Sequence, residues 1–341
     1  MTTRSPGTRG GTWPPAAALV HAGRFRDADR IIADHHARAL DEGCAEARSI
    51  FAVLEAEAAN ARGRVRTAAR RTREALSVDH EQGRLLHARR GHVVRALALA
   101  LAGQADAAAN ELRTLEDLGL PAGRDEVDLQ RARAWTAVAA GDIPGARHHL
   151  TEAAGRARAI GDVVGEATAL HDVARLGRAR EVCDRLLALA ARIDGDLAPA
   201  CAAHAVALAR NDGAALEEAA RDFGAMGADL LAAEAAADAA VARRRKGQLR
   251  DAAAAERHAA MLVTRCENPV TPALLAVEAR ARLTPAERET AVLAAAGRSN
   301  REIAEHLVLS PRTVENRLQR VYEKLGVAGR TALAEALDLG D

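Results

Sequence analysis

Hydrophobic positions near the C-terminal end recur with the period of an α-helix. The recurring positions are Val314, Leu318, Val321 and Leu325. Their spacing of i, i+4, i+7 and i+11 places them in one stripe along a single helix face. The opposite face carries Arg312, Glu315, Asn316, Gln319 and Arg320. The pattern predicts a helix whose apolar back packs into a core and whose front offers hydrogen-bond donors and acceptors.

Capping signals divide the surrounding stretch, residues 283–337, into four short helices. Residues 284–287 read Thr-Pro-Ala-Glu, which joins a capping box to a proline at the first helical position. Residues 299–302 repeat the Ser-x-x-Glu pattern, and Ser-Pro at 310–311 starts a third helix. Gly297 lies where a left-handed residue is expected to end the first helix.

The helix with the polar front follows a shorter helix and a tight turn. Residues 299–307 have one apolar face, and residues 308–309 make the turn. A short helix, a turn and a second helix with a buried back and a donor-rich front are typical of a helix-turn-helix. We therefore expect the helix at about 310–325 to enter the major groove of DNA.

Four runs of residues in this stretch resemble the LuxR-type (GerE) DNA-binding domain. They are residues 283–289 (LTPAERE), 297–304 (GRSNREIA), 310–318 (SPRTVENRL) and 322–327 (YEKLGV). The likeness runs nearly ungapped over about 55 of the 341 residues. One departure is Arg317, where the family often has histidine, and it leaves the backbone contact at that position open.

The resemblance implies roles for particular side chains. Glu315, Asn316 and Gln319 occupy the base-facing positions, where an amide can pair with adenine and a carboxylate can accept from cytosine. Contacts to the DNA backbone would come from Ser299, Asn300, Arg301, Ser310, Arg312, Thr313, Arg317 and Arg320. For Ser299 and Ser310, helix capping alone is the alternative.

The resemblance also implies a partner of the same sequence. Members of the family generally dimerise through their last helix, which is expected here at Thr331–Leu337. Its candidate interface residues are Ala332, Leu333 and Ala336. The expected partners are therefore double-stranded DNA with paired half-sites and a second copy of the chain.

Glycines mark a second periodic pattern before this domain. They are Gly23, Gly63, Gly103, Gly141, Gly177, a degenerate instance near Gly213, and Gly247, spaced 34 to 40 residues apart. An apolar residue follows most of them by two positions, and usually a small residue follows by five. This period predicts stacked helix pairs, in which the glycine ends the first helix in a left-handed turn. The phrase resembles tetratricopeptide-type repeats; the alternative is an irregular helical domain.

The patterns predict an all-α chain: a helical-repeat solenoid followed by a four-helix LuxR-type helix-turn-helix domain. We expect a disordered arm at residues 1–15, the repeats at 16–263, a linker at 264–278 and the DNA-binding domain at 279–341. Two prolines, Pro269 and Pro272, interrupt helix continuity within the linker.

Composition adds limits rather than a function. The 48 basic and 47 acidic residues nearly cancel, so net charge gives no sign of nucleic-acid binding. The four cysteines lack metal-ligand spacing, which is typical of buried or half-buried thiols in a reducing compartment. With no apolar run of membrane-spanning length and no signal-peptide layout, we expect a cytoplasmic protein.

The sequence offers little support for catalysis or for a cofactor. Lys246 and Lys324 are the only lysines and neither follows a glycine, so a phosphate-binding P-loop is excluded. The chain resembles the C-terminal part of the large ATP-dependent LuxR-type regulators without their ATPase module. The pairs His35-His36 and His148-His149 point apart on a helix and make poor metal sites. We expect no enzyme, no metal and no cofactor.

These observations favour a sequence-specific transcriptional regulator, with the repeats as a module for sensing, interaction or oligomerisation. Their concave face would bind a small-molecule, peptide or protein effector. The alternative is a helical-repeat interaction scaffold with weak or vestigial DNA binding. The basic run 243–246 is interpreted either as a solvated helix end or as a second contact with DNA or an acidic partner.

Overall fold

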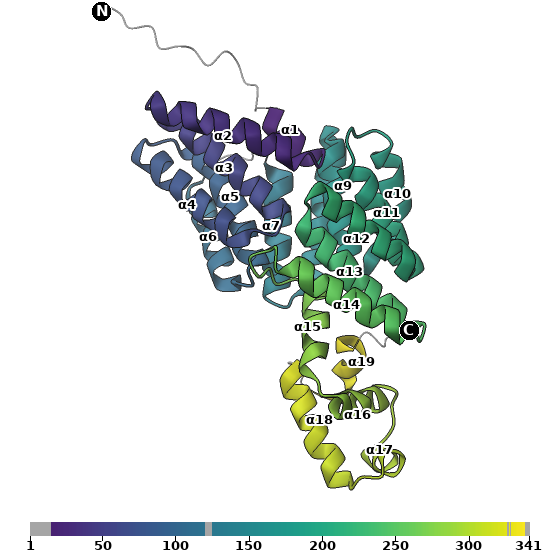
Figure 1. Ribbon diagram of the computed structural model, residues 1–341. Helices are drawn as coiled ribbons and strands as arrows, with labels where there is room; N and C mark the ends of the chain where they lie inside the picture. The colour runs from purple at the N-terminus through teal and green to yellow at the C-terminus, as the bar shows by residue number, and fades with distance from the viewer. Residues whose placement is uncertain (1–14, 120–124, 326, 328, 338–341) are drawn as a thin grey trace, which may run out of the picture.

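The protein consists of a curved array of paired helices and a smaller helical domain below it (Figure 1). A computed structural model describes residues 15–119, 125–325, 327 and 329–337. Every regular element in these residues is a helix, which confirms the predicted all-α fold. The arm predicted for residues 1–15 lies outside the described residues, apart from Pro15, where the first helix begins.

The array is built from helix pairs in chain order. They are α1 (Pro15–His21) with α2 (Phe25–Asp41), α3 (Ala45–Ala61) with α4 (Val65–Glu81), α5 (Leu85–Leu101) with α6 (Ala105–Asp117), α7 (Glu126–Ala139) with α8 (Ile143–Ile160), α9 (Val163–Val173) with α10 (Ala179–Ala190), α11 (Leu197–Arg210) with α12 (Gly213–Met226), and α13 (Asp229–Arg245) with α14 (Leu249–Val263). The two helices of each pair pack on one another, and each pair packs on the next, which is the arrangement the glycine period predicted.

The turns within pairs follow the predicted pattern of a left-handed glycine and a small residue five positions later. The glycines at 23, 63, 103, 141, 177 and 247 all have φ between 73° and 86°, a left-handed conformation that only glycine adopts without strain. The small residue five positions later is buried in each of these pairs. At the degenerate position the left-handed residue is Asn211 (φ 50°), while Gly213 begins α12.

The period in the sequence captured only half of the turns. Further left-handed glycines lie between pairs, among them Gly43, Gly83, Gly161 and Gly227. One departure concerns the apolar position after the glycine: Leu249 is 63% exposed, because it opens α14 on the outer side of the last pair.

Alanine allows the helices of the array to approach one another closely. In α13 the side chains of Ala232, Ala235, Ala236 and Ala239 are all fully buried. A helix surrounded by others on most of its circumference needs small residues, because larger ones would hold its neighbours apart. The alanine-rich composition therefore reflects dense packing around inner helices.

Each end of the array contacts a pair far away in the chain, so that the superhelix closes on itself. At one contact the backbone N–H of Asp196 donates to the carbonyl of Ala22, at 3.2 Å. At the other, residues 266–271, here called the closing segment, return to the first half of the array. The N–H of Glu267 donates to the carbonyl of Gly63 at 3.1 Å, and that of Val270 to the carbonyl of Leu101 at 2.6 Å.

Side chains reinforce the closing segment. The Glu267 carboxylate accepts from both the N–H and the hydroxyl of Thr67, each at 2.6 Å. Burial would raise the pKa of this carboxyl, but these hydrogen bonds hold it below its usual value. The Cys266 thiol is buried and donates to the carbonyl of Arg62 at 3.5 Å. Residues predicted to form a linker thus pack firmly on the repeats at this point.

Helix α15 (Pro272–Arg282) leads from the closing segment to the smaller domain. It packs against α13 of the repeats and against α18 (Pro311–Leu325) of the domain. The division proposed at residue 279 stays a prediction, since α15 crosses it without a break.

The smaller domain contains α16 (Pro285–Ala295), α17 (Asn300–Leu307), α18, a tight turn at Arg330–Ala332 and α19 (Leu333–Ala336). Its buried residues form a core separate from that of the repeats. The predicted stripe faces this core: Val314, Leu318 and Val321 are at most 3% exposed, and Leu325 is half-buried. The predicted four-helix arrangement is confirmed.

The contact at Gly63 can be tested by adding one methyl group. A Cβ there would lie 2.9 Å from the Cys266 sulfur and 3.0 Å from Leu230 Cβ, whereas a Cβ on Gly43 meets nothing within 4 Å. Both glycines are left-handed, so Gly43→Ala should cost about 1–2 kcal/mol for conformation alone. Gly63→Ala should cost about 1–3 kcal/mol more, because it also overpacks the closing segment. Urea denaturation followed by circular dichroism compares them, and equal losses would contradict the tight closure.

Candidate nucleic-acid interface

Capping side chains set the starts of α16 and α17. The Thr284 hydroxyl accepts from the N–H of Glu287 at 3.3 Å, and the Glu287 carboxylate accepts from the N–H of Thr284 at 2.8 Å. Ser299 and Glu302 make the same reciprocal pair, at 3.3 and 2.7 Å. Both predicted capping boxes are confirmed. They fix where each helix begins and hence how α17 lies against α18.

The turn between α17 and α18 is tight. Val308 ends α17 in the left-handed conformation (φ 54°) and is 90% exposed. The Ser310 hydroxyl then accepts from the N–H of Thr313 at 3.1 Å and pairs with the Thr313 hydroxyl at 2.7 Å. Capping by Ser310 is therefore present, and a contact with phosphate would be an additional role.

The predicted base-reading side chains share one exposed face. Glu315, Asn316 and Gln319 are all exposed on α18, opposite the buried stripe. Gln319 donates to Glu323 at 3.3 Å, a weak bond that leaves the amide available to a partner. In Figure 1 the α17–α18 end of the domain lies farthest from the repeats, so that the repeats do not cover this face.

The candidate backbone-contacting residues surround that face. Exposed among them are Ser299, Arg301, Ser310, Arg312 and Arg320, while Asn300, Thr313 and Arg317 are half-buried. Arg301 pairs with Glu305 at 3.2 Å, an exposed ion pair that costs little to break. Guanidinium and hydroxyl groups at the edges of an exposed helix face can donate to phosphate oxygens.

Two residues, Lys324 and Arg330, hold this surface in place through contacts that the sequence did not predict. Lys324 at the end of α18 donates to Glu287 at 2.6 Å and so ties α18 to the start of α16. Arg330 donates to the carbonyl of Arg298 at 2.6 Å and to the side chain of Asn300 at 2.5 Å. The hydrogen bond from Lys324, together with the backbone N–H of Thr284, lowers the pKa of Glu287 to about 2.

The candidate dimerisation residues lie in different surroundings. Leu333 is fully buried in the core of the domain, whereas Ala332 and Ala336 are half-buried. Ala336 and Leu325 line a cleft of about 890 Å³ that the repeats form on the other side with residues such as Arg147. The two alanines thus keep part of their surface exposed, whereas Leu333 belongs to the core of the domain, and their part in dimerisation stays a prediction.

The basic run 243–246 is held by the repeats. Arg243 makes two hydrogen bonds with the Glu217 carboxylate at 3.1 and 3.2 Å, and Arg244 donates to Glu256 at 2.8 Å. These pairs connect α13 with its neighbours α12 and α14. These contacts favour a structural role for the run over a contact with DNA or an acidic partner, because the guanidinium groups of Arg243 and Arg244 are already paired with carboxylates.

Comparisons with known proteins agree with the geometry of the smaller domain. A family model described as bacterial regulatory proteins, luxR family, matches residues 281–337. The spore germination protein GerE of Bacillus subtilis (strain 168) is 40% identical over 60 residues, which cover 17% of this chain and 81% of GerE. The chain therefore belongs to the LuxR family of bacterial regulatory proteins through its C-terminal domain.

Longer relatives share the same domain. A Mycobacterium bovis protein named as an HTH-type transcriptional regulator is 49% identical over 53 residues, which cover 16% of this chain. A Mycobacterium tuberculosis (strain CDC 1551 / Oshkosh) protein named in the same way matches to the same extent. The aligned residues span 6% of the length of each of these two relatives.

A solved structure of another protein resembles the repeats. The crystal structure of a Rap protein complexed with Competence and Sporulation Factor superposes with a TM-score of 0.57 and 14% identity, covering 75% of this chain and 77% of the Rap chain. At this identity the likeness concerns the fold, and it supports the helical-repeat architecture. In the described part of the chain, the helices are too short or too polar to cross a bilayer.

The Glu287–Lys324 pair should make the domain sensitive to acid. Because the folded-state pKa of Glu287 is depressed to about 2, its stabilisation is fully present above the ordinary value near 4.5 and is lost as the pH falls towards 2. Glu287→Gln keeps an acceptor for the cap but removes the charge, so it should lower stability at neutral pH and flatten the decline between these values. Near-UV circular dichroism of residues 272–341 monitors this domain, because Tyr322 is the one tyrosine in this fragment and it contains neither tryptophan nor phenylalanine. Glu289→Gln changes an exposed residue of the same helix and should leave the stability and its pH dependence as in the unmodified protein. If Glu287→Gln also leaves both unchanged, the Glu287–Lys324 pair does not stabilise the domain.

Proposed function

We propose that the protein is a sequence-specific DNA-binding transcriptional regulator whose helix α18 enters the major groove. The observation that carries the proposal is the exposed face of α18, where three hydrogen-bonding side chains lie opposite a buried apolar stripe. Membership of the LuxR family and the names of the mycobacterial relatives support the same function.

Base edges would be contacted from the exposed face of α18. Asn316 and Gln319 carry amides, which can pair with the donor and acceptor of adenine, and Glu315 can accept from cytosine. The face is already ordered, because the back of the helix is packed and Ser310 caps its start. Binding therefore costs little additional conformational entropy.

Register on the duplex would come from the residues around this face. Arg312 and Arg320 are exposed on α18 itself, and Ser299 and Arg301 lie at the start of α17. Their contacts would be with phosphates, which makes them strong contributors to affinity and weak contributors to sequence preference. A homodimer pairing around Ala332 and Ala336 would place two such surfaces on paired half-sites.

The repeats would act as the module that controls DNA binding. The Rap protein with the similar fold was solved in complex with Competence and Sporulation Factor. Here the closing segment connects the ends of α3 and α5 directly to α15, and α15 packs on α18. A ligand that changes how the array closes would therefore change the position of α15. The similarity to the large ATP-dependent regulators remains a prediction.

An interaction scaffold with vestigial DNA binding is the second candidate. The near-cancellation of 48 basic and 47 acidic residues favours it, because general attraction to DNA would be weak. The ordered and uncovered face of α18 argues against it. Selection of bound sequences from a random DNA pool separates the two functions.

Two single substitutions should affect DNA binding in different ways. Asn316→Ala removes a candidate base contact, so it should cost about 1–3 kcal/mol on the preferred sequence and relax preference at one position. Arg320→Ala removes a candidate phosphate contact, so it should weaken binding to all sequences alike and reduce the salt dependence. Fluorescence anisotropy across sequences and salt concentrations measures both. Unchanged affinity and preference for Asn316→Ala would refute the assignment of base reading.

A comparison of the whole chain with residues 272–341 tests control by the repeats. This fragment keeps α15 and the separate core of the smaller domain. If the repeats set the position or pairing of the domain, the fragment should differ from the whole chain in DNA affinity or in dimerisation. Equal affinity and equal oligomeric state, measured by anisotropy and sedimentation, would leave the repeats without a controlling role.

A further inference from the structure

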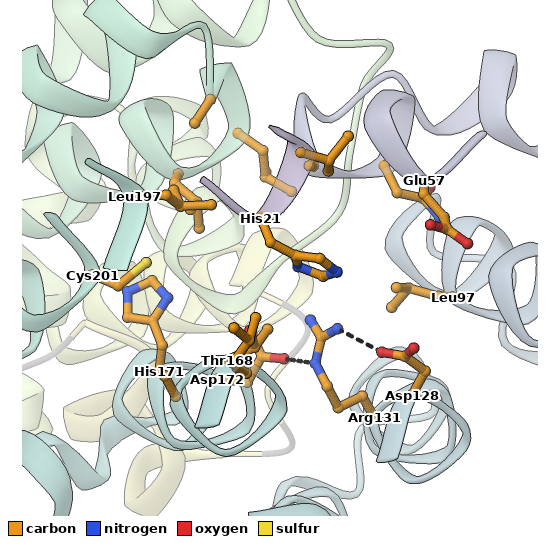
Figure 2. Close-up of a pocket in the computed structure, with 18 of the residues that line it drawn as sticks. His21, Glu57, Leu97, Asp128, Arg131, Thr168, His171, Asp172, Leu197 and Cys201 are labelled. Atoms are coloured by element: carbon orange, nitrogen blue, oxygen red, sulfur yellow. Dashed lines mark hydrogen bonds and ion pairs between the residues drawn. The ribbon is translucent and has the colours of Figure 1, made fainter. Parts of the chain in front are cut away.

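Closure of the array creates a cavity of about 190 Å³ at its centre (Figure 2). Its lining comes from α1, from the first helices of the following pairs and from α11. Most of the wall is apolar and includes Phe25, Val94, Leu97 and Leu197. Figure 2 shows His21 of α1 above Arg131 of α7, with Leu197 and Cys201 of α11 on one side and Glu57 of α3 on the other.

The size and walls of the cavity suit a small molecule with an apolar body. A buried apolar cavity of about 150 Å³ accommodates benzene. A space of about 190 Å³ therefore accepts roughly one ring with a short substituent. Apolar side chains around such a body would gain from excluding water.

A ladder of alternating charges crosses one side of the cavity. Its members, in order, are Glu57, Arg90, Asp128, Arg131, Asp172, Arg175 and Glu234. The six members that line the cavity balance in charge, and Glu234, which pairs with Arg175 behind the wall, is the one further carboxylate. His171 also lines the cavity, and burial lowers its pKa well below the usual value.

The deep end of the ladder is saturated. Asp172 accepts from Arg131 at 2.9 Å, from Trp135 at 3.2 Å and from Arg175 at 2.6 Å. Arg175 also binds Glu234 through two hydrogen bonds and stacks on the Trp135 ring at 4.2 Å. Burial would raise the pKa of Asp172, but Arg131 and Arg175 hold it at about 2. These contacts hold the wall of the cavity in place.

Asp128 is the loosely held member. Its nearest cations are Arg131 Nη1 at 3.5 Å and Arg90 Nη1 at 3.7 Å, both beyond an ordinary charge-assisted hydrogen bond. Its side chain is 42% exposed, and Figure 2 shows its carboxylate at the edge of the cavity beside Arg131. Glu57 is more tightly paired, because one of its oxygens accepts from Arg90 at 2.6 Å. Asp128 is thus the most accessible carboxylate of the ladder.

We propose that the cavity binds a small amphipathic amine, whose ammonium group lies against Asp128 and whose apolar body fills the space between α1, α5 and α11. An anionic ligand in this position would meet the Asp128 carboxylate. An uncharged one would replace water at Asp128 with at most a neutral hydrogen bond, which is weaker than a charge-assisted one. The assignment names the ligand of the control module proposed above and rests on that function. The ligand would contact α1 and α11, the two helices that meet where Ala22 bonds Asp196, and would stabilise closure there.

Isothermal titration calorimetry of the full chain tests the assignment with three probes of one shape: 2-phenylethylamine, 2-phenylethanol and 3-phenylpropionate. The amine should bind at least about 10-fold more tightly than the other two. Asp128→Asn should weaken the amine by about 10- to 100-fold, as expected for a lost charge-assisted hydrogen bond. Asp184→Asn, an exposed aspartate on α10 away from the cavity, should leave amine affinity unchanged. Ala198→Phe, which fills the cavity from α11, should abolish binding while circular dichroism shows intact helices.

The proposal is overturned if none of the probes binds, if the carboxylate binds as well as the amine, or if Asp128→Asn retains full affinity. It is also overturned if Ala198→Phe is folded and still binds. Anisotropy with labelled DNA, with and without the amine, tests the control function separately. Amine binding that depends on Asp128 but leaves DNA affinity unchanged would refute control by the repeats and keep the ligand assignment. A difference in DNA binding between the whole chain and residues 272–341, together with no amine binding, would refute the ligand assignment and keep control by the repeats.

Discussion

The closed form of the array depends on the hydrogen bonds between the closing segment and the first half of the repeats. Two backbone N–H groups, of Glu267 and Val270, donate to carbonyls at the ends of α3 and α5, and the Glu267 carboxylate accepts twice from Thr67. An open solenoid needs contacts between neighbouring repeats only. Contacts across the superhelix convert it into a ring, and the ring in turn encloses the central cavity and fixes the origin of α15.

Local features of this architecture were predictable from the sequence because local constraints determine them. Left-handed turns favour glycine or asparagine, and capping boxes need particular residues three positions apart. The helix pairs, the starts of α16 and α17 and the buried back of α18 follow from such patterns. The glycine period predicts only the turns within pairs, whereas the glycines between pairs, such as Gly43, are left-handed as well.

Ring closure and the charge ladder were not predictable, because their members are far apart in the chain. Thr67 and Glu267 are separated by 200 residues, and Arg175 and Glu234 by 59. Neither pair belongs to a periodic pattern, and each residue alone is indistinguishable from a solvated surface group. For the same reason the role of Lys324 was not predictable, because its hydrogen bond to Glu287 depends on how α16 and α18 lie relative to one another. Residues 264–278 looked like a linker because two prolines break the helix, a local signal that says nothing about distant contacts.

Exposure of α18 limits how the repeats can act on DNA binding. Glu315, Asn316 and Gln319 are exposed on α18 with the repeats in place, so that control by simple covering is not the arrangement observed. What the repeats do contact is the other end of the domain, where α15 packs on α18 and Ala336 lines the shared cleft. The candidate surface for a second chain lies at this same end. We therefore infer that any control operates on the orientation and pairing of two DNA-binding domains. Such coupling typically amounts to about 1–3 kcal/mol, which is within the reach of the few hydrogen bonds that the closing segment makes.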